Sequence, residues 1–157
     1  SLEGTRPILV EIQALASPSN LGTPRRTAIG VDHNRVSLLV AVLDKICGLH
    51  LGGSDIFLNV AGGVKVEEPA VDLGIVSAMA SSFLDRKVDH LTVIFGEVGL
   101  TGEVRAVSQM EARIKEAARL GFSRSIIPYS TQTSISPPPG MEIRPIRSLG
   151  ELLENLY

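Results

Sequence analysis

The sequence predicts a mixed α/β fold, because segments with strand-like and helix-like apolar spacing alternate along most of the chain. In residues 7–17 apolar side chains occupy every second position, which is typical of a half-buried strand. In residues 36–47 they recur every three or four positions, which is typical of a helix with one apolar face. The 157 residues are 44% hydrophobic, so a sizeable core of Val, Ile, Leu and Ala can form. We therefore expect two or three packed layers of helices and sheet.

The same spacing, together with residues that begin or end helices, predicts the other elements. Strands are expected at 27–31, 55–61, 91–95 and 124–127, with a turn and a short strand within 97–107. Helices are expected from the cap at Asp32 to the stop at Gly48, over 69–83, over 108–120, and after Ser148. Ser108 with Glu111, and Ser148 with Glu151, have the spacing of a capping box. Residues 17–26 and 131–140 are expected to form loops.

Composition excludes several classes of protein. Cys47 is the only cysteine, so no disulfide or cysteine-based zinc site can form within the chain, and we expect it to be a buried apolar residue. No apolar run approaches the roughly 20 residues that a membrane-spanning helix needs. The net charge of −2 gives no global signal for nucleic-acid binding, so contact with DNA would need a local cluster of cations. The absence of an initiator Met and of a signal peptide favours a cytoplasmic piece of a longer chain.

Three blocks of sequence occur in a specific order. They are residues 10–15 with 24–28, then 57–63, and then 95–105 followed by Glu111–Arg113 and Ile126–Pro128. Together they resemble the C-terminal Lon-protease-like domain of the RadA/Sms family of DNA-repair ATPases. The resemblance implies one domain over residues 1–157, cut from a longer ATPase chain. It also implies a Lon protease-like, ribosomal protein S5 domain 2-like fold, in which a mixed sheet is packed with helices.

The resemblance also identifies the positions of a catalytic pair. Lon proteases use a Ser–Lys dyad, in which the lysine takes the proton of the attacking serine. Aligned with this chain, the serine position falls on Asp72 and the lysine position on Glu111. A carboxylate is a poor nucleophile for a peptide and two acids cannot form this dyad, so no catalytic residue is expected. Asp72 suits the first turn of a helix and Glu111 suits a capping box. A metal site from these two carboxylates alone would lack a third type of ligand, and none is expected.

An active peptidase of the Lon type is the alternative reading. Its nucleophile would have to be Ser77, Ser81 or Ser82, with Lys65 or Lys115 as the base, although serines on a packed helix are usually small packing residues. The histidines His33, His50 and His90 are expected in surface or capping roles. Gly62 to Lys65 lacks the pattern of a phosphate-binding loop, so no cofactor is expected in this domain. By resemblance, ATP, Mg and Zn would bind in the segment that precedes it.

The family resemblance suggests a homohexameric ring that drives branch migration on single-stranded or branched DNA, with a RecA-type recombinase as a possible partner. Contact with DNA that does not depend on base sequence needs cations aimed at phosphates. The candidate residues are Arg6, Arg25, Arg26, Arg35, Lys65 and Arg105. Acids nearby in sequence could neutralise some of them, and ordinary solvated charge is the simpler interpretation of each one. A scaffold without contact to DNA is therefore a third hypothesis.

Overall fold

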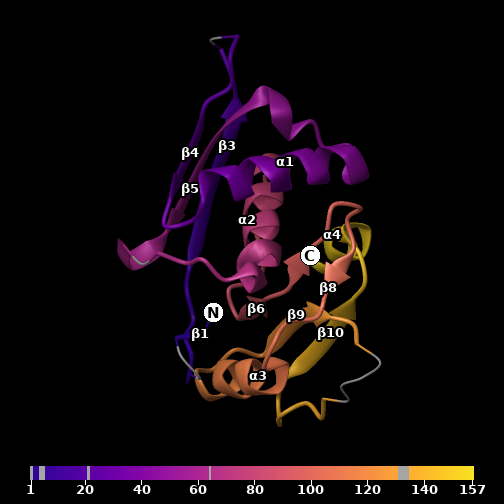
Figure 1. Ribbon diagram of the computed structural model, residues 1–157. Coiled ribbons are helices and arrows are strands. Elements are labelled where there is room, and N and C mark those ends of the chain that lie inside the picture. Colours follow the sequence, from indigo (N-terminus) through magenta and orange to yellow (C-terminus); the bar gives the residue numbers. More distant parts are fainter. Residues whose placement is uncertain (1, 4–5, 21, 64, 131–134) are drawn as a thin grey trace.

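The computed structural model describes residues 2–3, 6–20, 22–63, 65–130 and 135–157, with the backbone alone for residues 2, 3, 6 and 63. Two three-stranded sheets form its framework (Figure 1). In the first, the central strand β5 (Ser54–Val60) pairs with β3 (Ile12–Pro18) antiparallel and with β4 (Arg26–Ile29) parallel. In the second, the central strand β9 (Arg124–Pro128) pairs in parallel with β6 (Thr92–Ile94) and β10 (Glu142–Ile146). The mixed α/β class predicted from the sequence is confirmed.

The remaining elements are short strand pairs, helices and single turns. The strand pairs are β1 (Leu2–Glu3) with β2 (Arg6–Pro7), and β7 (Glu97–Val98) with β8 (Val104–Arg105). The α-helices are α1 (His33–Cys47), α2 (Asp72–Leu84), α3 (Met110–Arg119) and α4 (Leu149–Asn155). Turns of 3-10 helix are η1 (Leu51–Gly53), η2 (Ala61–Gly63) and η3 (Pro69–Val71), the last of which leads directly into α2. In the described part of the chain no helix is long and apolar enough to cross a membrane.

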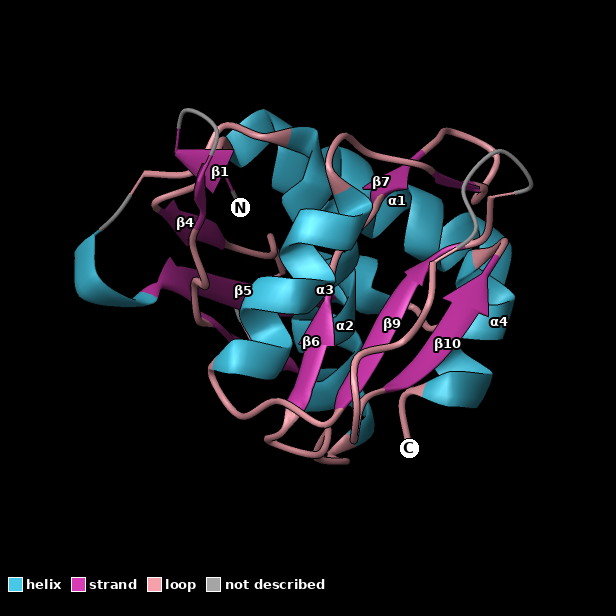
Figure 2. Ribbon diagram, turned by 90° about the horizontal axis from the view of Figure 1, so that it is seen from below, coloured by secondary structure: helices cyan, strands magenta, loops and turns pink. Residues whose placement is uncertain are grey.

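The helices form layers around the two sheets. Helix α3 covers one face of the second sheet, and α2 and α4 lie on its other face (Figure 2). The side chains of β9 follow this arrangement, since Ile126 belongs to the main core with α1, α2 and α4, whereas Ile127 packs with Phe95 and Ile114 in a smaller core under α3. Alternate residues of a strand point to opposite faces, so one buried strand serves both cores.

Local capping sets the ends of α1 and α4 as predicted. The Asp32 side chain accepts a hydrogen bond from the Asn34 backbone N–H at 3.1 Å, and Gly48 ends α1 in the left-handed region at φ 66°. The Ser148 hydroxyl accepts from the Glu151 N–H at 3.2 Å. The Glu151 carboxylate accepts from the Arg147 N–H at 2.8 Å. The second hydrogen bond of the capping box therefore comes from the residue before the cap Ser148, and not from Ser148 itself.

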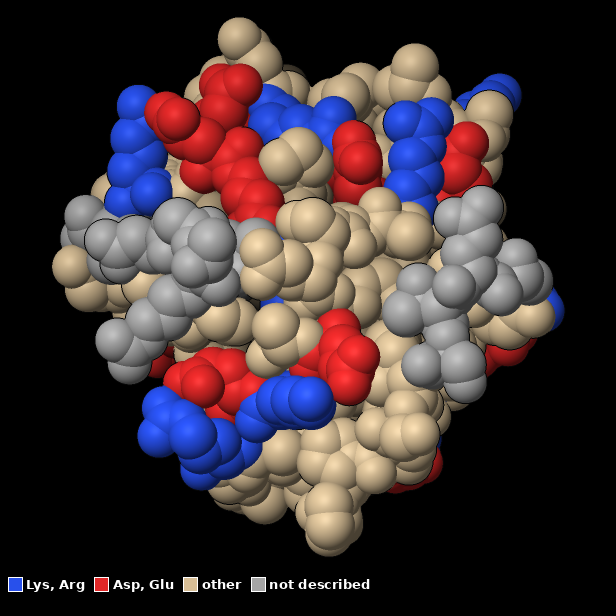
Figure 3. Space-filling view, turned by 60° about the horizontal axis from the view of Figure 1, so that its bottom comes forward, with Lys and Arg blue, Asp and Glu red and all other residues tan. Residues whose placement is uncertain are grey.

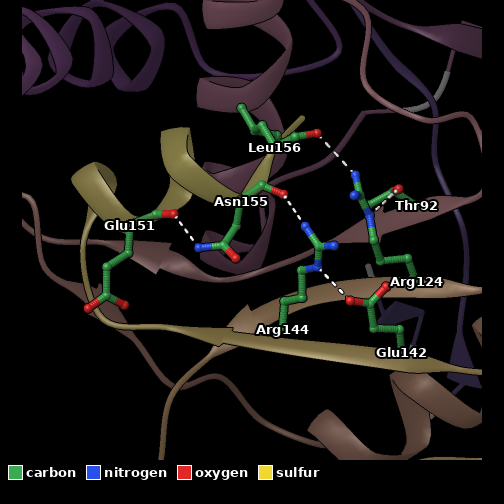
Figure 4. A network of polar contacts seen from close by, with 7 residues as sticks. All are labelled: Thr92, Arg124, Glu142, Arg144, Glu151, Asn155 and Leu156. Atoms are coloured by element: carbon green, nitrogen blue, oxygen red, sulfur yellow. Dashed lines mark hydrogen bonds and ion pairs between the residues drawn. The ribbon is translucent and has the colours of Figure 1, made fainter.

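Arginines of the second sheet hold the C-terminal end of α4 (Figure 4). Arg124 donates to the Leu156 carbonyl at 3.0 Å and to the Thr92 hydroxyl at 2.9 Å. Arg144 donates to the Asn155 carbonyl at 3.1 Å and to the Glu142 carboxylate at 2.8 Å. Because the last carbonyls of a helix have no partner within it, these guanidinium groups satisfy them and fix α4 against the sheet.

Three sequence predictions need correction. The expected strand 7–17 is regular only from Ile12, because residues 8–11 extend beyond the end of their neighbour β5. Helix α3 begins at Met110 without a capping box, since Gln109 adopts the left-handed region at φ 55° and no side chain caps the helix. Strand β10 was not predicted, because Pro145 and the charged residues at 142 and 144 hide its apolar face. Of the expected loop 131–140, residues 131–134 lie outside the described residues.

Gly102 offers a test of how the β7–β8 turn packs on α1. It has φ +80°, and a Cβ there would come within 2.9 Å of the Ile46 side chain. We expect Gly102→Ala to lower the free energy of unfolding by about 2–4 kcal/mol through backbone strain and overpacking, measured by urea denaturation. Gly140 has φ +79°, and a Cβ there would have no neighbouring atom within 4 Å. Gly140→Ala is therefore the matched control, which adds the backbone strain without the overpacking. Equal losses in the two variants would contradict the packing described here.

Candidate functional site

Asp72, which the Lon resemblance aligns with a serine nucleophile, forms a buried ion pair. Asp72, the first residue of α2, receives the Arg35 guanidinium of α1, with Nε to Oδ1 at 2.9 Å and a second, shorter contact from Nη2 to Oδ2. The Val98 N–H of β7 donates to the same Oδ2 at 3.1 Å, and Arg35 Nη2 also donates to the Val98 carbonyl at 3.1 Å. The bidentate pair of Arg35 and Asp72, together with the Val98 backbone that bonds to both side chains, thus joins α1, α2 and β7.

Burial makes this pair asymmetric. The Asp72 side chain is 1% exposed, whereas that of Arg35 is 31% exposed. The hydrogen bond to Asp72 raises the pKa of Arg35, and the carboxylates of Asp72 and Glu97 add to that rise against the opposing effect of burial. Asp72 is therefore a buried carboxylate that the Arg35 guanidinium and the Val98 N–H hold in place. The sequence prediction correctly placed Asp72 in the first turn of a helix, but it did not identify Arg35 as its partner.

The second dyad position lies in a different environment. Glu111 is 59% exposed on α3 and pairs with Lys115, one turn further along the helix, at 3.2 Å. Its predicted capping role is wrong, because α3 starts at Met110 without a side-chain cap. Asp72 and Glu111 thus have separate partners on separate helices. Exposed pairs such as that of Glu111 add little to stability.

The alternative serines are also engaged by backbone groups. Ser77 donates to the Leu73 carbonyl at 2.7 Å, Ser81 donates to the Arg86 carbonyl at 2.5 Å, and Ser82 accepts from the Ala16 N–H at 2.9 Å. Lys65 and Lys115, the candidate bases, each pair with a glutamate at 3.2 Å. Within the described residues, no hydrogen bond links one of these serines to a lysine.

The structure provides no metal-binding cluster in the part of the chain that it describes, where groups of three His, Cys, Asp or Glu side chains are not found. The histidines His33, His50 and His90 are exposed at or next to the ends of elements, as the sequence predicted. Cys47 is half-buried, and burial raises the pKa of its thiol, so the thiolate is disfavoured.

Two of the predicted DNA-contacting arginines lie at the start of β4. Arg25 is exposed, and its backbone N–H donates to the Asp55 carboxylate at 2.7 Å. Arg26 is half-buried, and its guanidinium donates to the carbonyls of Ser54 at 2.7 Å and Gly52 at 3.3 Å. The Arg26 guanidinium thus binds carbonyl groups of this chain and ties β4 to the start of β5.

The other predicted cations also have nearby acids. Lys65 is 3.2 Å from Glu67, and Arg105 is 3.7 Å from Glu103, with both cations more than half exposed. The side chain of Arg6 lies outside the part of the chain that is described. Among the described residues on the face shown in Figure 3, Lys and Arg side chains lie next to Asp and Glu side chains and form no continuous basic track.

Comparison with known proteins places the chain in a family. Residues 13–131 match the sequence profile described as ChlI, subunit ChlI of Mg-chelatase. The chain belongs to the ChlI family. Proteins named DNA repair protein RadA are similar to nearly all of this ChlI-family chain. The protein from Bacillus subtilis (strain 168) is 57% identical over 153 residues, and that from Listeria monocytogenes (strain EGD-e) is 47% identical over 154 residues.

The relatives are longer than this chain. The two alignments cover 98% of the chain but only 33% and 34% of the relatives. The RadA protein of Streptococcus pneumoniae (strain R6) is 44% identical over all 157 residues, which are 37% of its length. The ChlI-family chain thus spans about a third of the length of the curated relatives it matches. The predicted resemblance to RadA is confirmed, and the assignment as Lon-like stays a prediction.

A double-mutant cycle tests the Arg35–Asp72 pair. Arg35→Met leaves an almost fully buried carboxylate without its cation, so we expect a loss of about 2–4 kcal/mol in the free energy of unfolding. Asp72→Asn leaves an arginine that can turn toward water, so a smaller loss of about 1–2 kcal/mol is expected. Chemical denaturation of both single variants and the double variant gives the coupling. The exposed Glu111→Gln and Lys115→Met pair is the control, with a coupling below about 0.5 kcal/mol. Additive losses at Arg35 and Asp72 would be inconsistent with the pair described.

Proposed function

We propose that the chain is a non-proteolytic Lon-like module of a RadA-type DNA repair and recombination ATPase, in which it serves hexamer assembly and DNA binding. The observation that carries the non-proteolytic part is the buried Arg35–Asp72 pair at the expected nucleophile position. The repair role is supported by relatives named DNA repair protein RadA that match 98% of the chain.

The remaining activities of such a protein belong, in this proposal, to the two thirds of the relatives' length that the chain does not span. ATP hydrolysis with Mg, and a zinc-binding segment, are placed there. Branch migration in the cytoplasm, with a RecA-type recombinase as a possible partner, would then be the work of the whole assembly. This chain would contribute a rigid ring-forming surface and contacts to the phosphate backbone.

The exposed cations Arg25, Lys65 and Arg105 are the strongest candidates for DNA contact. The salt bridges of Lys65 and Arg105 are surface pairs, and such pairs contribute little, so a phosphate can replace the acid at low cost. Arg26 and Arg35 are assigned to holding the fold, because their guanidinium groups bind carbonyls and Asp72. No aromatic platform is proposed, so binding should be insensitive to base sequence.

Fluorescence anisotropy with labelled single-stranded DNA tests this proposal. We expect Arg25→Ala, Lys65→Ala and Arg105→Ala combined to weaken binding at least tenfold. The slope of log K against log salt should fall by about 2, since each phosphate contact contributes about 0.7 on single strands. The control combines Lys45→Ala, Lys115→Ala and Arg119→Ala, which removes the same charge from other exposed sites. Binding that is equal in the two triple variants would refute these contacts, and no binding by the wild type would favour a scaffold.

A further inference from the structure

A groove of about 840 Å³ separates the two sheets. Its walls are the chain from Pro7 to Ala14 on one side and β6 with the following Phe95 on the other. Helix α2 forms its floor, and α3 contributes Arg113 and Glu116. Asp72 itself does not line this groove, although Ala70, Val71 and Gly74 beside it do. Most of the exposed lining is apolar, as expected of a binding cleft.

One wall of the groove is a free strand edge. Strand β6 is the last strand of its sheet. The residues on either side of it bond to β9: the Arg124 N–H donates to the Leu91 carbonyl, and the Phe95 N–H donates to the Ile126 carbonyl, both at 3.3 Å. Backbone groups alternate in direction along a parallel strand, so those of Thr92 and Ile94 point away from β9. The Thr92 N–H donates to the Asp89 carbonyl at 3.1 Å, so the N–H that this edge offers to a ligand is that of Ile94. The Ile94 carbonyl is accordingly 3.8 Å from the place where a Cβ on Gly74 of α2 would lie.

The opposite wall is a second free edge. Strand β3 is also the last strand of its sheet, and the Glu11 carbonyl accepts from the Ala61 N–H at 2.9 Å on the side of β5. Even-numbered residues therefore direct their backbone groups away from β5, as the 2.9 Å bond from Ala16 N–H to Ser82 on α2 demonstrates. Val10, Ile12 and Ala14 line the groove, as do Leu9 and Glu11. Two strand edges thus border one groove.

The floor of the groove is built of small residues, and charged side chains, among them Glu11, Arg113 and Glu116, also line the groove. The floor residues Gly74, Ser77, Ala78 and Ser81 are small. Arg113 lies against the groove with only 4% of its side chain exposed. Its Nε donates to the Ser108 carbonyl at 2.9 Å and its Nη2 pairs with Glu68, whereas Nη1 is buried with no hydrogen-bond partner in the described structure. A buried guanidinium nitrogen without an acceptor is costly, which points to an acceptor supplied from outside.

We propose that this groove binds an extended, mainly apolar peptide segment of a partner protein as an additional β-strand, with an acidic side chain directed at Arg113. The free backbone groups of β6 and of residues 8–14 would recognise the peptide main chain, and the small floor residues would accept its apolar side chains. The added strand would join the two sheets into one. This inference does not depend on the proposed DNA-binding role.

The test uses the 157-residue protein and the fluorescein-labelled peptide Gly-Val-Thr-Val-Asp-Val-Thr-Gly. We expect saturable binding by anisotropy, and amide hydrogen exchange at Ile94 at least tenfold slower in the complex, because its N–H gains a partner. Methylation of the nitrogens of alternate peptide residues removes main-chain donors and should weaken binding about tenfold. Replacing the peptide's Asp by Asn should weaken it about fivefold, since charged hydrogen bonds are the stronger ones.

Two protein variants separate groove filling from loss of structure. Ala78→Leu adds bulk to the half-buried floor of the groove and should weaken binding at least tenfold without loss of thermal stability. Ala41→Leu makes the same change at an exposed position of α1 and should leave binding unchanged. No binding of the peptide, equal affinity for Ala78→Leu and wild type, or tolerance of the methylated peptide would overturn the proposal. Self-association that Ala78→Leu abolishes, seen by sedimentation, would identify a second copy as the occupant and also overturn it.

Discussion

The Arg35–Asp72 ion pair is the interaction on which the arrangement around α2 depends. It joins the first turn of α1, the start of α2 and the backbone of β7, with Val98 both donating to the carboxylate and accepting from the guanidinium. Because Asp72 is 1% exposed, its carboxylate depends on these partners for its hydrogen bonds. The pair therefore fixes where α2 begins relative to α1 and to the β7–β8 turn, and α2 in turn supports both sheets.

This constraint connects the fold with the proposed loss of peptidase chemistry. A position that would need a mobile, nucleophilic hydroxyl is occupied by a carboxylate locked by a guanidinium and a backbone N–H. The base position lies on the exposed face of α3, where Glu111 pairs with Lys115. Asp72 and Glu111 thus have separate ion-pair partners, Arg35 on α1 and Lys115 on α3. The relatives named RadA give the biological setting in which such a module would act.

Sequence reasoning was most accurate where structure depends on neighbours in the chain. The cap at Asp32 and the stop at Gly48 depend on residues within one turn, and both are confirmed. Arg35 and Asp72 are 37 positions apart, so no local pattern indicates that they meet. Gln109 takes a left-handed conformation, and α3 begins at Met110, two residues after the predicted cap at Ser108. The groove was missed for the same reason, since it arises from how two sheet edges face each other. A buried-helix pattern at 69–83, with its small residues, was the nearest available signal.

Restoring the dyad by sequence is the most direct test of the claim that these positions form no catalytic pair. The variant Asp72→Ser with Glu111→Lys carries the Lon residues at both positions. It should hydrolyse no casein and form no covalent adduct with a serine-reactive fluorophosphonate, measured by intact-protein mass spectrometry. The wild type should likewise show neither, and Ser77→Ala should change nothing. An adduct on the serine at position 72, or casein turnover by the wild type that Ser77→Ala abolishes, would contradict the account.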